Sequence, residues 1–518
     1  MRFAEAAVTV WLATMALVFA GPQTAAATNA RRDDFVWPTQ GWEVASPEAE
    51  GMDSADLARL VETVGATRQD SLLVVRRGRI VAEAYYAPFA SDIRHDLRSV
   101  TKSVVGTLIG IAVQEGLIDS VDSKVLALFA DKPIAAADDR KSAMTIQNLL
   151  DMTSGLAWTE RTYAPDETVS QMYLSPDRAR FVLERPMAAA PGAQFLYDSG
   201  DAYLLSALIT LKTGRSAFDF ARSRLFDPLG IARARWGTVD AQGATDGVSG
   251  LFLTPRDMAK IGYLYLREGV WEGRRILPAS WVARARSGPV PASDGFHYGN
   301  LWWSLPEKGA FMARGRHAQL ILVLPKLDIV AVMTGNLHDD DFYPVGRLID
   351  ALAGAAKSDA PLPEDPIARS LLAAAVRQAA TERPSAVGDT PDLAKAISDQ
   401  TYRFEDNPLH VKTITLHLVG PNPSWEITTQ TGPPGEEPER FAGLIGLDGT
   451  FRIGPPASYG IDAVKGRWLG ARVFRAERRI LGHGETQSWT LAFEDRGVVV
   501  DFETTDGVRV RLRGSRGD

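Results

Sequence analysis

A serine and a lysine three residues apart, Ser99 and Lys102, form the strongest chemical signal in the sequence. They open an apolar segment, residues 101–117, that is too long for a normal strand and predicts a buried helix. Residues three apart share one face of a helix. A serine hydroxyl becomes a good nucleophile when a base takes its proton, and a lysine held in a dry site can be that base. The alternative is a capping serine beside a solvated lysine, but a lysine in an apolar helix is costly unless it is useful.

A tyrosine about a hundred residues later could complete such a site. Tyr197 is followed by Asp198, Ser199 and Gly200, directly before a helix expected over residues 202–213. A phenol that is hydrogen-bonded to a lysine can pass protons between a nucleophile and a leaving group. The alternative is a loop tyrosine next to an Asp or Ser that caps the helix.

A third segment, residues 313–319, leads into a strand expected over residues 320–324 and contains Gly315 and His317. An edge strand that is entered through a glycine can turn backbone N–H groups toward a bound carbonyl. A Ser/His pairing would use His317, but a structural, hydrogen-bonding histidine is the favoured interpretation. The sequence has no G-x-S-x-G motif, which argues against an α/β-hydrolase.

The composition narrows the chemistry further. None of the 518 residues is Cys, which excludes disulfide scaffolds, cysteine nucleophiles and Cys-ligated metals. Hydrophobic residues make up 45% and charged residues 23%, which is ordinary for globular proteins. A net charge of -7 leaves no basic footprint for nucleic acid. The length suggests about two to four domains.

The N-terminal residues 1–27 have the pattern of a signal peptide. Arg2 precedes a short apolar run over residues 8–20, and small residues that resemble a cleavage site follow at positions 24–27. An uncleaved membrane anchor is the alternative. We therefore expect an exported protein, periplasmic or secreted, whose mature form has no stable membrane span.

The order of the expected helices and strands indicates an α+β architecture. Residues 71–86 form an expected hairpin around Arg77-Gly78. Further helices are expected over residues 145–150, 176–183 (capped by Ser175), 202–213 (ended by Gly214) and 254–267 (capped by Thr254). Strands follow over residues 300–304, 319–324 and 329–334. This order favours an antiparallel sheet with segregated helices.

The chain changes character near residue 356. Residues 356–366 read as a linker, and a helix is expected over residues 367–380. Short strands are then expected over residues 410–418, 424–429, 449–453, 458–465, 468–474, 486–493, 497–504 and 508–512, a spacing typical of an all-β barrel or sandwich. Trp425, Trp468 and Trp489 are interpreted as core residues of that region, with a ligand groove as the alternative.

Taken in order, Ser99-x-x-Lys102, Tyr197-Asp198-Ser199 and the segment 315–319 resemble the motifs of the serine β-lactamase and penicillin-binding-protein superfamily, in its class C-like branch. Residues 145–156 and 256–262 are similar to further segments of that family, and the resemblance spans residues 42–352. The segment 315–319, GRHAQ, is most similar to the G-x-H-G-Q of 6-aminohexanoate-dimer hydrolases and related esterases, with Ala318 in place of a glycine. Lys-Thr-Gly is absent, which argues against efficient β-lactam hydrolysis.

The resemblance implies a β-lactamase/transpeptidase-like fold, with a helical subdomain beside an antiparallel sheet that carries helices on both faces. It implies no metal or organic cofactor. The site it implies has Ser99 as nucleophile, Lys102 as general base, Tyr197 as proton shuttle, the N–H groups of Ser99 and Arg316 as oxyanion hole, and Ser199, His317 and Gln319 as substrate-binding candidates.

These observations divide the chain into a signal peptide (1–27), a hydrolase domain (28–355), a linker and helix (356–398) and a β-rich accessory domain (399–518). We expect an exported serine hydrolase that cleaves a small amide, ester or peptide through an acyl-enzyme on Ser99, with no nucleic-acid partner. One alternative is a D-stereospecific peptidase, D,D-carboxypeptidase or weak β-lactamase. Another is a penicillin-binding-type ligand sensor with little turnover. The pocket is expected to be built from loops 160–173 and 289–300.

Overall fold

The structure is a computed structural model that describes residues 35–132, 134, 138–237, 239–337, 344–387, 390–431, 437–457 and 459–516. The expected signal peptide lies outside these ranges. Within them, no helix combines the length and the apolar character that crossing a membrane requires.

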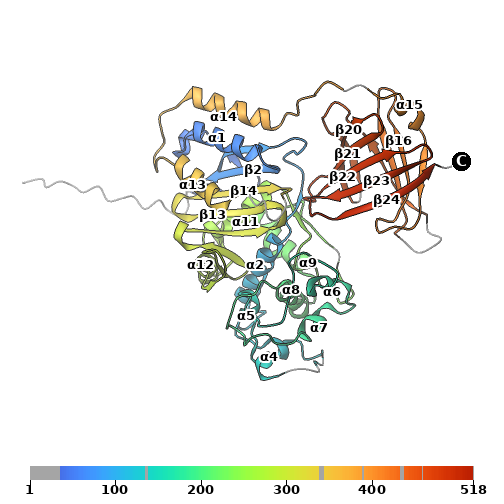
Figure 1. The fold of residues 1–518 in the computed structure, drawn as a ribbon. Helices are drawn as coiled ribbons and strands as arrows, with labels where there is room; N and C mark the ends of the chain where they lie inside the picture. Colours follow the sequence, from blue (N-terminus) through green and yellow to red (C-terminus); the bar gives the residue numbers. More distant parts are fainter. Residues whose placement is uncertain are drawn as a thin grey trace, which may run out of the picture. The chain divides into compact units, whose positions relative to one another are not determined.

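A nine-stranded sheet forms the centre of the first part of the chain, in the order β1-β3-β2-β14-β13-β12-β11-β10-β9 (Figure 1). The pair β1 and β3 is parallel, and the other neighbours are antiparallel. The strands are β1 (Glu43–Val44), β2 (Gln69–Arg76), β3 (Arg79–Tyr85), β9 (Val290–Pro291), β10 (His297–Gly299), β11 (Trp302–Leu305), β12 (Ala310–Gly315), β13 (Gln319–Leu324) and β14 (Ile329–Gly335).

The predicted hairpin is confirmed as β2 and β3. Its turn consists of Arg77 and Gly78, with φ of 50° and 81°, which matches the right-handed twist of the two strands. The strand expected from residue 300 begins later, because Asn300 and Leu301 also have positive φ and form the turn between β10 and β11.

Helices cover both faces of this sheet (Figure 1). One face packs against α1 (Ser54–Gly65), α13 (Val345–Ala355) and α14 (Pro366–Ala379). The other face packs against α2 (Val100–Gln114), α11 (Pro255–Leu266) and α12 (Ala279–Ser287). Both faces of the central strands are therefore buried, which explains why β13 and β14 are almost continuously apolar.

A helical region packs around α8 (Ser199–Thr213), most of whose residues are buried. The surrounding helices are α3 (Val125–Leu128), α4 (Asp139–Ala143), α5 (Ile146–Leu150), α6 (Thr168–Leu174), α7 (Arg178–Leu183), α9 (Ala217–Ala221) and α10 (Asp227–Leu229). Gly214, with φ of 66°, ends α8, and the Thr254 hydroxyl caps α11, as expected. The predicted cap of α7 is wrong: Asp177, not Ser175, accepts the N–H of Arg180 at 3.0 Å, because Ser175 is bonded to Asp177 itself.

Two small sheets complete this part of the chain. Strands β4 (His95–Asp96), β5 (Arg235–Trp236) and β6 (Leu251–Leu253) form a three-stranded sheet in the order β4-β6-β5, and β4 shortly precedes Ser99 in the chain. Strands β7 (Val270–Trp271) and β8 (Arg274–Arg275) form a two-stranded one. A short helix, α15 (Leu393–Ile397), then precedes the C-terminal strands.

Ten antiparallel strands form a second sheet, which we call the C-terminal sheet, in the order β18-β17-β16-β15-β24-β23-β22-β21-β20-β19 (Figure 1). A bridge between Gly446, just after β18, and Lys465 in β20 brings its two ends together, so the sheet is a nearly closed barrel. Its strands are β15 (Thr401–Phe404), β16 (Val411–His417), β17 (Ser424–Thr429), β18 (Glu439–Leu444), β19 (Arg452–Ala457), β20 (Gly460–Gly470), β21 (Val473–Ile480), β22 (Thr486–Phe493), β23 (Gly497–Thr504) and β24 (Arg509–Arg516).

The interior of the C-terminal sheet is aromatic and aliphatic, and Trp425 and Trp489 are buried in it, as their interpretation as core residues expects. Trp468 is only half-buried: it packs against the same core and also lines a groove on this sheet. Two strands were predicted over residues 458–465 and 468–474. In the structure the first continues to Gly470 as β20, and the second begins at Val473 as β21. Gly466 lies within β20 and makes room for the ring of Phe474: a Cβ on Gly466 would lie 2.4 Å from that ring. The α+β fold with a C-terminal barrel is thus confirmed.

Candidate active site

Ser99 lies at the start of α2, and Lys102 lies one turn later on the same face. The lysine side chain is 1% exposed. Its Nζ donates hydrogen bonds to Ser99 Oγ at 2.9 Å and to the carbonyl of Val248 at 3.2 Å. The amine and the hydroxyl are therefore within the distance that direct proton transfer requires. A lysine amine with so few partners is costly in the interior, and this contact gives it a chemical purpose.

The nucleophile candidate follows a backbone turn of unusual conformation. Arg98, directly before Ser99, has φ of 49°, a left-handed conformation that non-glycine residues rarely adopt. Asp96 stabilises this turn by accepting the N–H of Arg98 at 2.9 Å, and Leu97 donates its own N–H to Leu251 in β6 at 2.8 Å. The three-stranded sheet thus determines where Ser99 enters the helix.

Tyr197 comes from the loop before α8, which is capped by the carboxylate of Asp198. Its ring borders the same pocket as Ser99. Burial raises the pKa of Tyr197 above its usual value of 10, and the charge of Glu160 raises it further, whereas the nearby hydroxyl of Ser99 lowers it. The ring stacks on Trp303 at 5.9 Å, and Lys102 Nζ lies 5.1 Å from the ring centre. The structure therefore brings the serine, the lysine and the tyrosine together.

The end of β12 lies against the start of α2. A Cβ on Gly315 would lie 2.4 Å from the carbonyl oxygen of Leu97 and 3.0 Å from the backbone nitrogen of Ser99, so this approach requires a glycine. Arg316 begins the following turn, in which His317 and Ala318 have φ of 61° and 65°. The two residues expected to form an oxyanion hole, Ser99 and Arg316, accordingly border the same pocket.

This pocket has a volume of about 250 Å³. Besides Ser99 and Tyr197, its wall contains three guanidinium groups and one carboxylate. Glu160, the carboxylate, accepts hydrogen bonds from Trp158 Nε1 at 2.6 Å and from the backbone of Ser199 at 2.7 Å. The remaining residues of the wall are Arg161, Tyr163, Trp303, Arg314, Gly315 and Arg316.

Aromatic rings hold two of the guanidinium groups. Arg314 lies 4.8 Å from the ring of Phe296, and burial lowers the pKa of its guanidinium below the usual 12.5. Arg316 lies 4.8 Å from the ring of Tyr163. Burial raises the pKa of that tyrosine to about 12. The wall is thus positively charged and aromatic, a combination suited to a small substrate that carries a carboxylate.

The three substrate-binding candidates lie outside this wall. The side chain of Ser199 is fully buried at the start of α8. His317 is 1% exposed, with Nδ1 3.2 Å from the carbonyl of Leu337. The amide of Gln319 donates to the carbonyl oxygens of His317 at 3.3 Å and of Gly335 at 2.9 Å. His317 and Gln319 therefore stabilise the turn after β12 and do not face the pocket.

Sequence reasoning found part of the wall. The loop over residues 160–173 supplies Glu160, Arg161 and Tyr163, as expected, whereas the loop over residues 289–300 supplies none of the residues that line the pocket. Trp303 and Arg314 were missed. They lie on the neighbouring strands β11 and β12, and β12 was not predicted as a strand.

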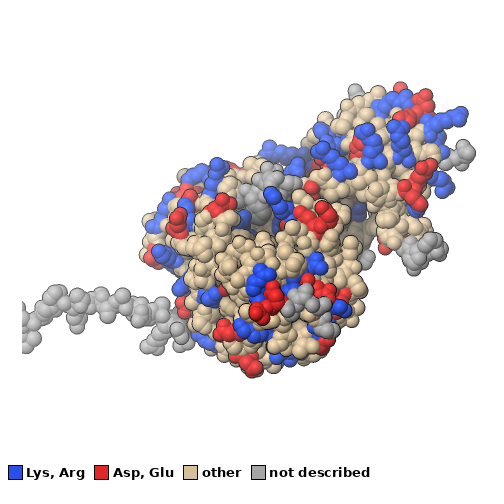
Figure 2. Space-filling view, turned by 60° about the horizontal axis from the view of Figure 1, so that its bottom comes forward, with Lys and Arg blue, Asp and Glu red and all other residues tan. Residues whose placement is uncertain are grey.

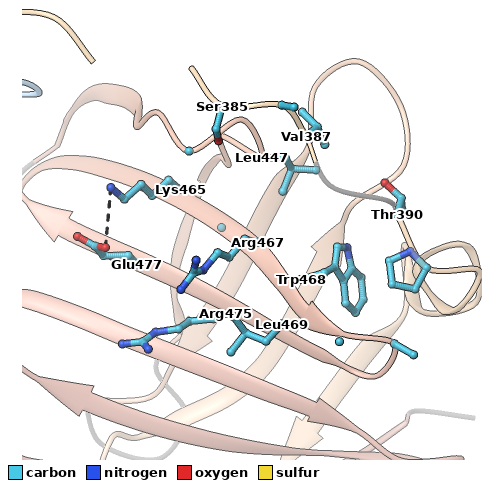
Figure 3. A pocket seen from close by; sticks show the side chains of 16 residues that line it. Ser385, Val387, Thr390, Leu447, Lys465, Arg467, Trp468, Leu469, Arg475 and Glu477 are labelled. Atoms are coloured by element: carbon cyan, nitrogen blue, oxygen red, sulfur yellow. Dashed lines mark ion pairs between the residues drawn. The ribbon is translucent and has the colours of Figure 1, made fainter. Parts of the chain in front are cut away.

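A second hollow lies outside the C-terminal sheet. It is a groove of about 990 Å³ between residues 385–387, 390 and 391 on one side and the strands β20 and β21 on the other (Figure 3). Lys465 and Glu477 face each other across neighbouring strands at 3.9 Å, and Arg467 and Arg475 are exposed beside them. Its lining contains no arrangement of nucleophile and base like that of Ser99 and Lys102.

Comparisons with known proteins agree with this fold. A profile of the β-lactamase family matches residues 57–355. The chain is 27% identical over 307 residues to the 6-aminohexanoate-dimer hydrolase of Paenarthrobacter ureafaciens, which covers 55% of this chain and 77% of that protein. A solved structure of a putative 6-aminohexanoate-dimer hydrolase from Bacillus anthracis superposes with a TM-score of 0.53 at 22% identity, over 63% of this chain and 90% of that one. A putative β-lactamase from Bacteroides dorei gives 0.50 at 18%, over 59% and 100%.

Proposed function

Because the chain belongs to the β-lactamase family, we propose that it is a serine hydrolase in which Ser99 forms an acyl-enzyme with a small amide, ester or peptide. The observation that carries the proposal is the contact between Lys102 Nζ and Ser99 Oγ at 2.9 Å, on a buried lysine whose only other hydrogen-bond acceptor among the described residues is the carbonyl of Val248. A lysine placed in this way can take the hydroxyl proton as Ser99 attacks.

Acylation starts when Ser99 Oγ attacks the carbonyl carbon and its proton passes to the lone pair of Lys102 Nζ. The backbone N–H groups of Ser99 and Arg316 stabilise the negative oxygen of the tetrahedral intermediate. When the intermediate collapses, the C–N or C–O bond breaks, and the leaving group takes a proton from Lys102 through the phenol of Tyr197. Burial keeps that phenol protonated at neutral pH, as a donor requires.

Deacylation repeats these steps with water. A water molecule attacks the acyl carbonyl and gives its proton to the Tyr197 and Lys102 pair. The same N–H groups stabilise the second intermediate. Its collapse breaks the bond to Ser99 Oγ, which regains a proton from Lys102, and the acid product leaves. No step in this sequence uses the buried side chains of His317 or Gln319.

The charge of the pocket favours substrates with a free carboxylate near the scissile bond. Arg161, Arg314 and Arg316 face a volume of about 250 Å³, which suits a short acyl or amide chain. A linear amide with a terminal carboxylate fits this description, as does the C-terminal end of a peptide. The arginines therefore also favour the second candidate function, a D-stereospecific peptidase or D,D-carboxypeptidase.

A substrate panel tests the proposal and separates the candidates. Purified protein is assayed with p-nitrophenyl esters, linear amide oligomers, D-Ala-D-Ala peptides and a chromogenic β-lactam, beside Ser99→Ala. We expect turnover of an ester or amide, with kcat/KM lower by on the order of 10⁴-fold in Ser99→Ala. Full activity in Ser99→Ala would contradict the mechanism. An acyl adduct on Ser99 that is released over hours would indicate a ligand sensor instead.

We also propose that the protein is exported, because residues 1–27 have the pattern of a signal peptide. Expression of the full chain in a bacterial host, followed by fractionation and N-terminal sequencing, tests it. A mature N-terminus near residue 28 in the periplasm or the medium is expected. Full-length protein in the cytoplasm would contradict export and leave the hydrolase proposal unaffected.

A further inference from the structure

We propose that two turns of the C-terminal sheet position the catalytic turns of the hydrolase, and that this sheet is therefore required for the rate of the chemical step. The inference rests on the proposed function and assigns a role to residues outside the family match, which ends at residue 355. One turn joins β21 to β22 (residues 481–485), and the other joins β23 to β24 (residues 505–508).

The first of these turns lies against the residues that lead into Ser99. The carbonyl of Gly482 accepts the N–H of Asp96 at 2.6 Å, and the carbonyl of His483 accepts a hydrogen bond from the Arg98 guanidinium at 2.6 Å. A Cβ on Gly482 would lie 2.0 Å from the carbonyl oxygen of Arg94, so the two backbones touch. The contact ends one residue before the nucleophile.

The contacted segment is one that needs support. Arg98 holds a left-handed backbone conformation, which costs free energy and persists only where surrounding contacts impose it. Its guanidinium and the N–H of Asp96 are both bound to the C-terminal sheet, and Asp96 in turn accepts the N–H of Arg98. The direction in which Ser99 leaves this turn thus depends on residues almost four hundred positions later.

The second turn lies against the other side of the pocket. The carboxylate of Asp506 is 3.4 Å from the guanidinium of Arg316 and 3.6 Å from Nε2 of the buried His317. Thr505 Oγ1 donates to the side chain of Asn336, just after β14, at 3.0 Å. These contacts bind the turn that follows Gly315, where the second N–H of the oxyanion hole is expected.

Both turns also contact one residue, His317. A Cβ on Gly484, in the first turn, would lie 3.2 Å from the side chain of His317, which the second turn contacts through Asp506. Asn336 likewise contacts Thr486 at the start of β22 as well as Thr505. One region of the C-terminal sheet therefore touches both the Ser99 turn and the Arg316 turn.

An apolar contact keeps these parts together. Phe451, Ala463 and Leu481 of the C-terminal region are buried in one cluster with Phe89, which lies after β3. The rings and aliphatic groups exclude water beside the polar contacts, which strengthens those contacts. Since a displacement of about 1 Å at a reacting group can cost about 100-fold in rate, small changes at this contact should be visible in kcat.

Two matched pairs of variants test the proposal in the full-length protein. Gly482→Ala adds a methyl group against the carbonyl of Arg94, whereas Gly420→Ala adds one at another positive φ with no atom within 4 Å. Asp506→Asn removes the charge next to Arg316, whereas Asp501→Asn removes the charge of an exposed carboxylate that pairs with Arg511 on the same two strands. Circular dichroism and Tm show which variants are folded.

We expect kcat for the best ester of the panel to fall by about ten- to 100-fold in Gly482→Ala and by about three- to tenfold in Asp506→Asn. KM should stay within about threefold, and both control variants should match the wild type. Wild-type kcat in folded Gly482→Ala and Asp506→Asn would overturn the proposal. So would a rise in KM at constant kcat, which would indicate a substrate-binding role. A wild type that neither turns over esters nor reacts with a fluorophosphonate would instead contradict the proposed function.

Discussion

The pocket beside Ser99 and the groove on the C-terminal sheet differ in volume and in the side chains that line them. The groove is the larger, at about 990 Å³ against about 250 Å³. The pocket, however, places a buried lysine 2.9 Å from a serine hydroxyl, whereas the lysine of the groove is half-buried and is paired with a carboxylate at 3.9 Å. The pairing of a buried lysine with a serine hydroxyl, rather than volume, identifies the reactive site.

The same contrast holds for the interiors of the two parts. The first part of the chain buries ionisable groups such as Lys102, Asp198 and Asp201, whereas the core of the C-terminal sheet is formed mainly by aromatic and aliphatic side chains, beside the buried pair of Asp462 and Arg478. Charged side chains of that sheet crowd its outer surface, where Figure 2 shows basic and acidic groups side by side. Buried charge reduces stability and serves chemistry, so the two parts should respond differently to substitution.

Lys102→Met should have the largest effect on activity. Methionine fills a similar space without a group that accepts a proton, so kcat/KM should fall by about 10² to 10⁴-fold. Because a buried amine is replaced by an apolar side chain, Tm should stay equal or rise. Steady-state kinetics with the best ester and a thermal melt measure both. Loss of activity together with a lower Tm would mean that Lys102 is mainly structural.

Tyr197→Phe should have the next largest effect. The ring still stacks on Trp303, but the phenol hydroxyl beside Ser99 is gone, so kcat should fall by about ten- to 100-fold with little change in folding. Rates with leaving groups of different basicity provide the check. The loss should be largest for poor leaving groups, which need a proton. An equal loss for all of them would argue against proton donation by Tyr197.

Asp201→Asn should change the stability of the fold rather than the reaction rate. Burial, and then repulsion from Asp198, raises the pKa of Asp201 above its usual 3.8. A carboxyl with a raised folded-state pKa stabilises the fold below its unfolded-state pKa, and this stability is lost as pH rises through the folded-state value. At pH 7 the amide should therefore increase the free energy of unfolding by about 1–3 kcal/mol.

Denaturant titrations at pH 7 and near pH 3.5 measure this difference. The gain of Asp201→Asn over the wild type should shrink at the lower pH, where Asp201 is protonated. A variant that is less stable than the wild type at pH 7 would show that the buried carboxylate is held by compensating hydrogen bonds.

Asp501→Asn should have the smallest effect. Asp501 pairs with Arg511 on the outside of the C-terminal sheet, and this hydrogen bond lowers the pKa of Asp501 below its usual value. Both side chains are at least half exposed, so the pair contributes about 0–1 kcal/mol. We expect an unchanged kcat and a change in unfolding free energy within that range. A larger loss would mean that the outer ion pairs support the sheet more than their exposure indicates.

Features with local signals could be predicted from the sequence. The hairpin of β2 and β3, the Thr254 cap and the apolar run of α2 depend on neighbouring residues, and all three are present. The grouping of Ser99, Lys102 and Tyr197 was predicted from the resemblance of three motifs, taken in order, to those of the β-lactamase superfamily.

Features that depend on contacts distant in sequence could not be predicted. Strand β12 has Arg314 and Gly315 at its end, and only pairing with β11 and β13 gives it its role. Whether Ser199 or Gln319 faces the pocket depends on how the surrounding elements pack. The contact of Asp506 with Arg316 joins positions that no local pattern connects.

Covalent labelling with a fluorophosphonate tests the central claim most directly. We expect a single phosphonyl adduct by intact-mass measurement, mapped to Ser99 by peptide analysis, absent in Ser99→Ala and formed at least about 100-fold more slowly in Lys102→Met. An adduct on another serine would contradict the role of Ser99 as the nucleophile. Equal labelling rates in the wild type and Lys102→Met would contradict the role of Lys102 as its base.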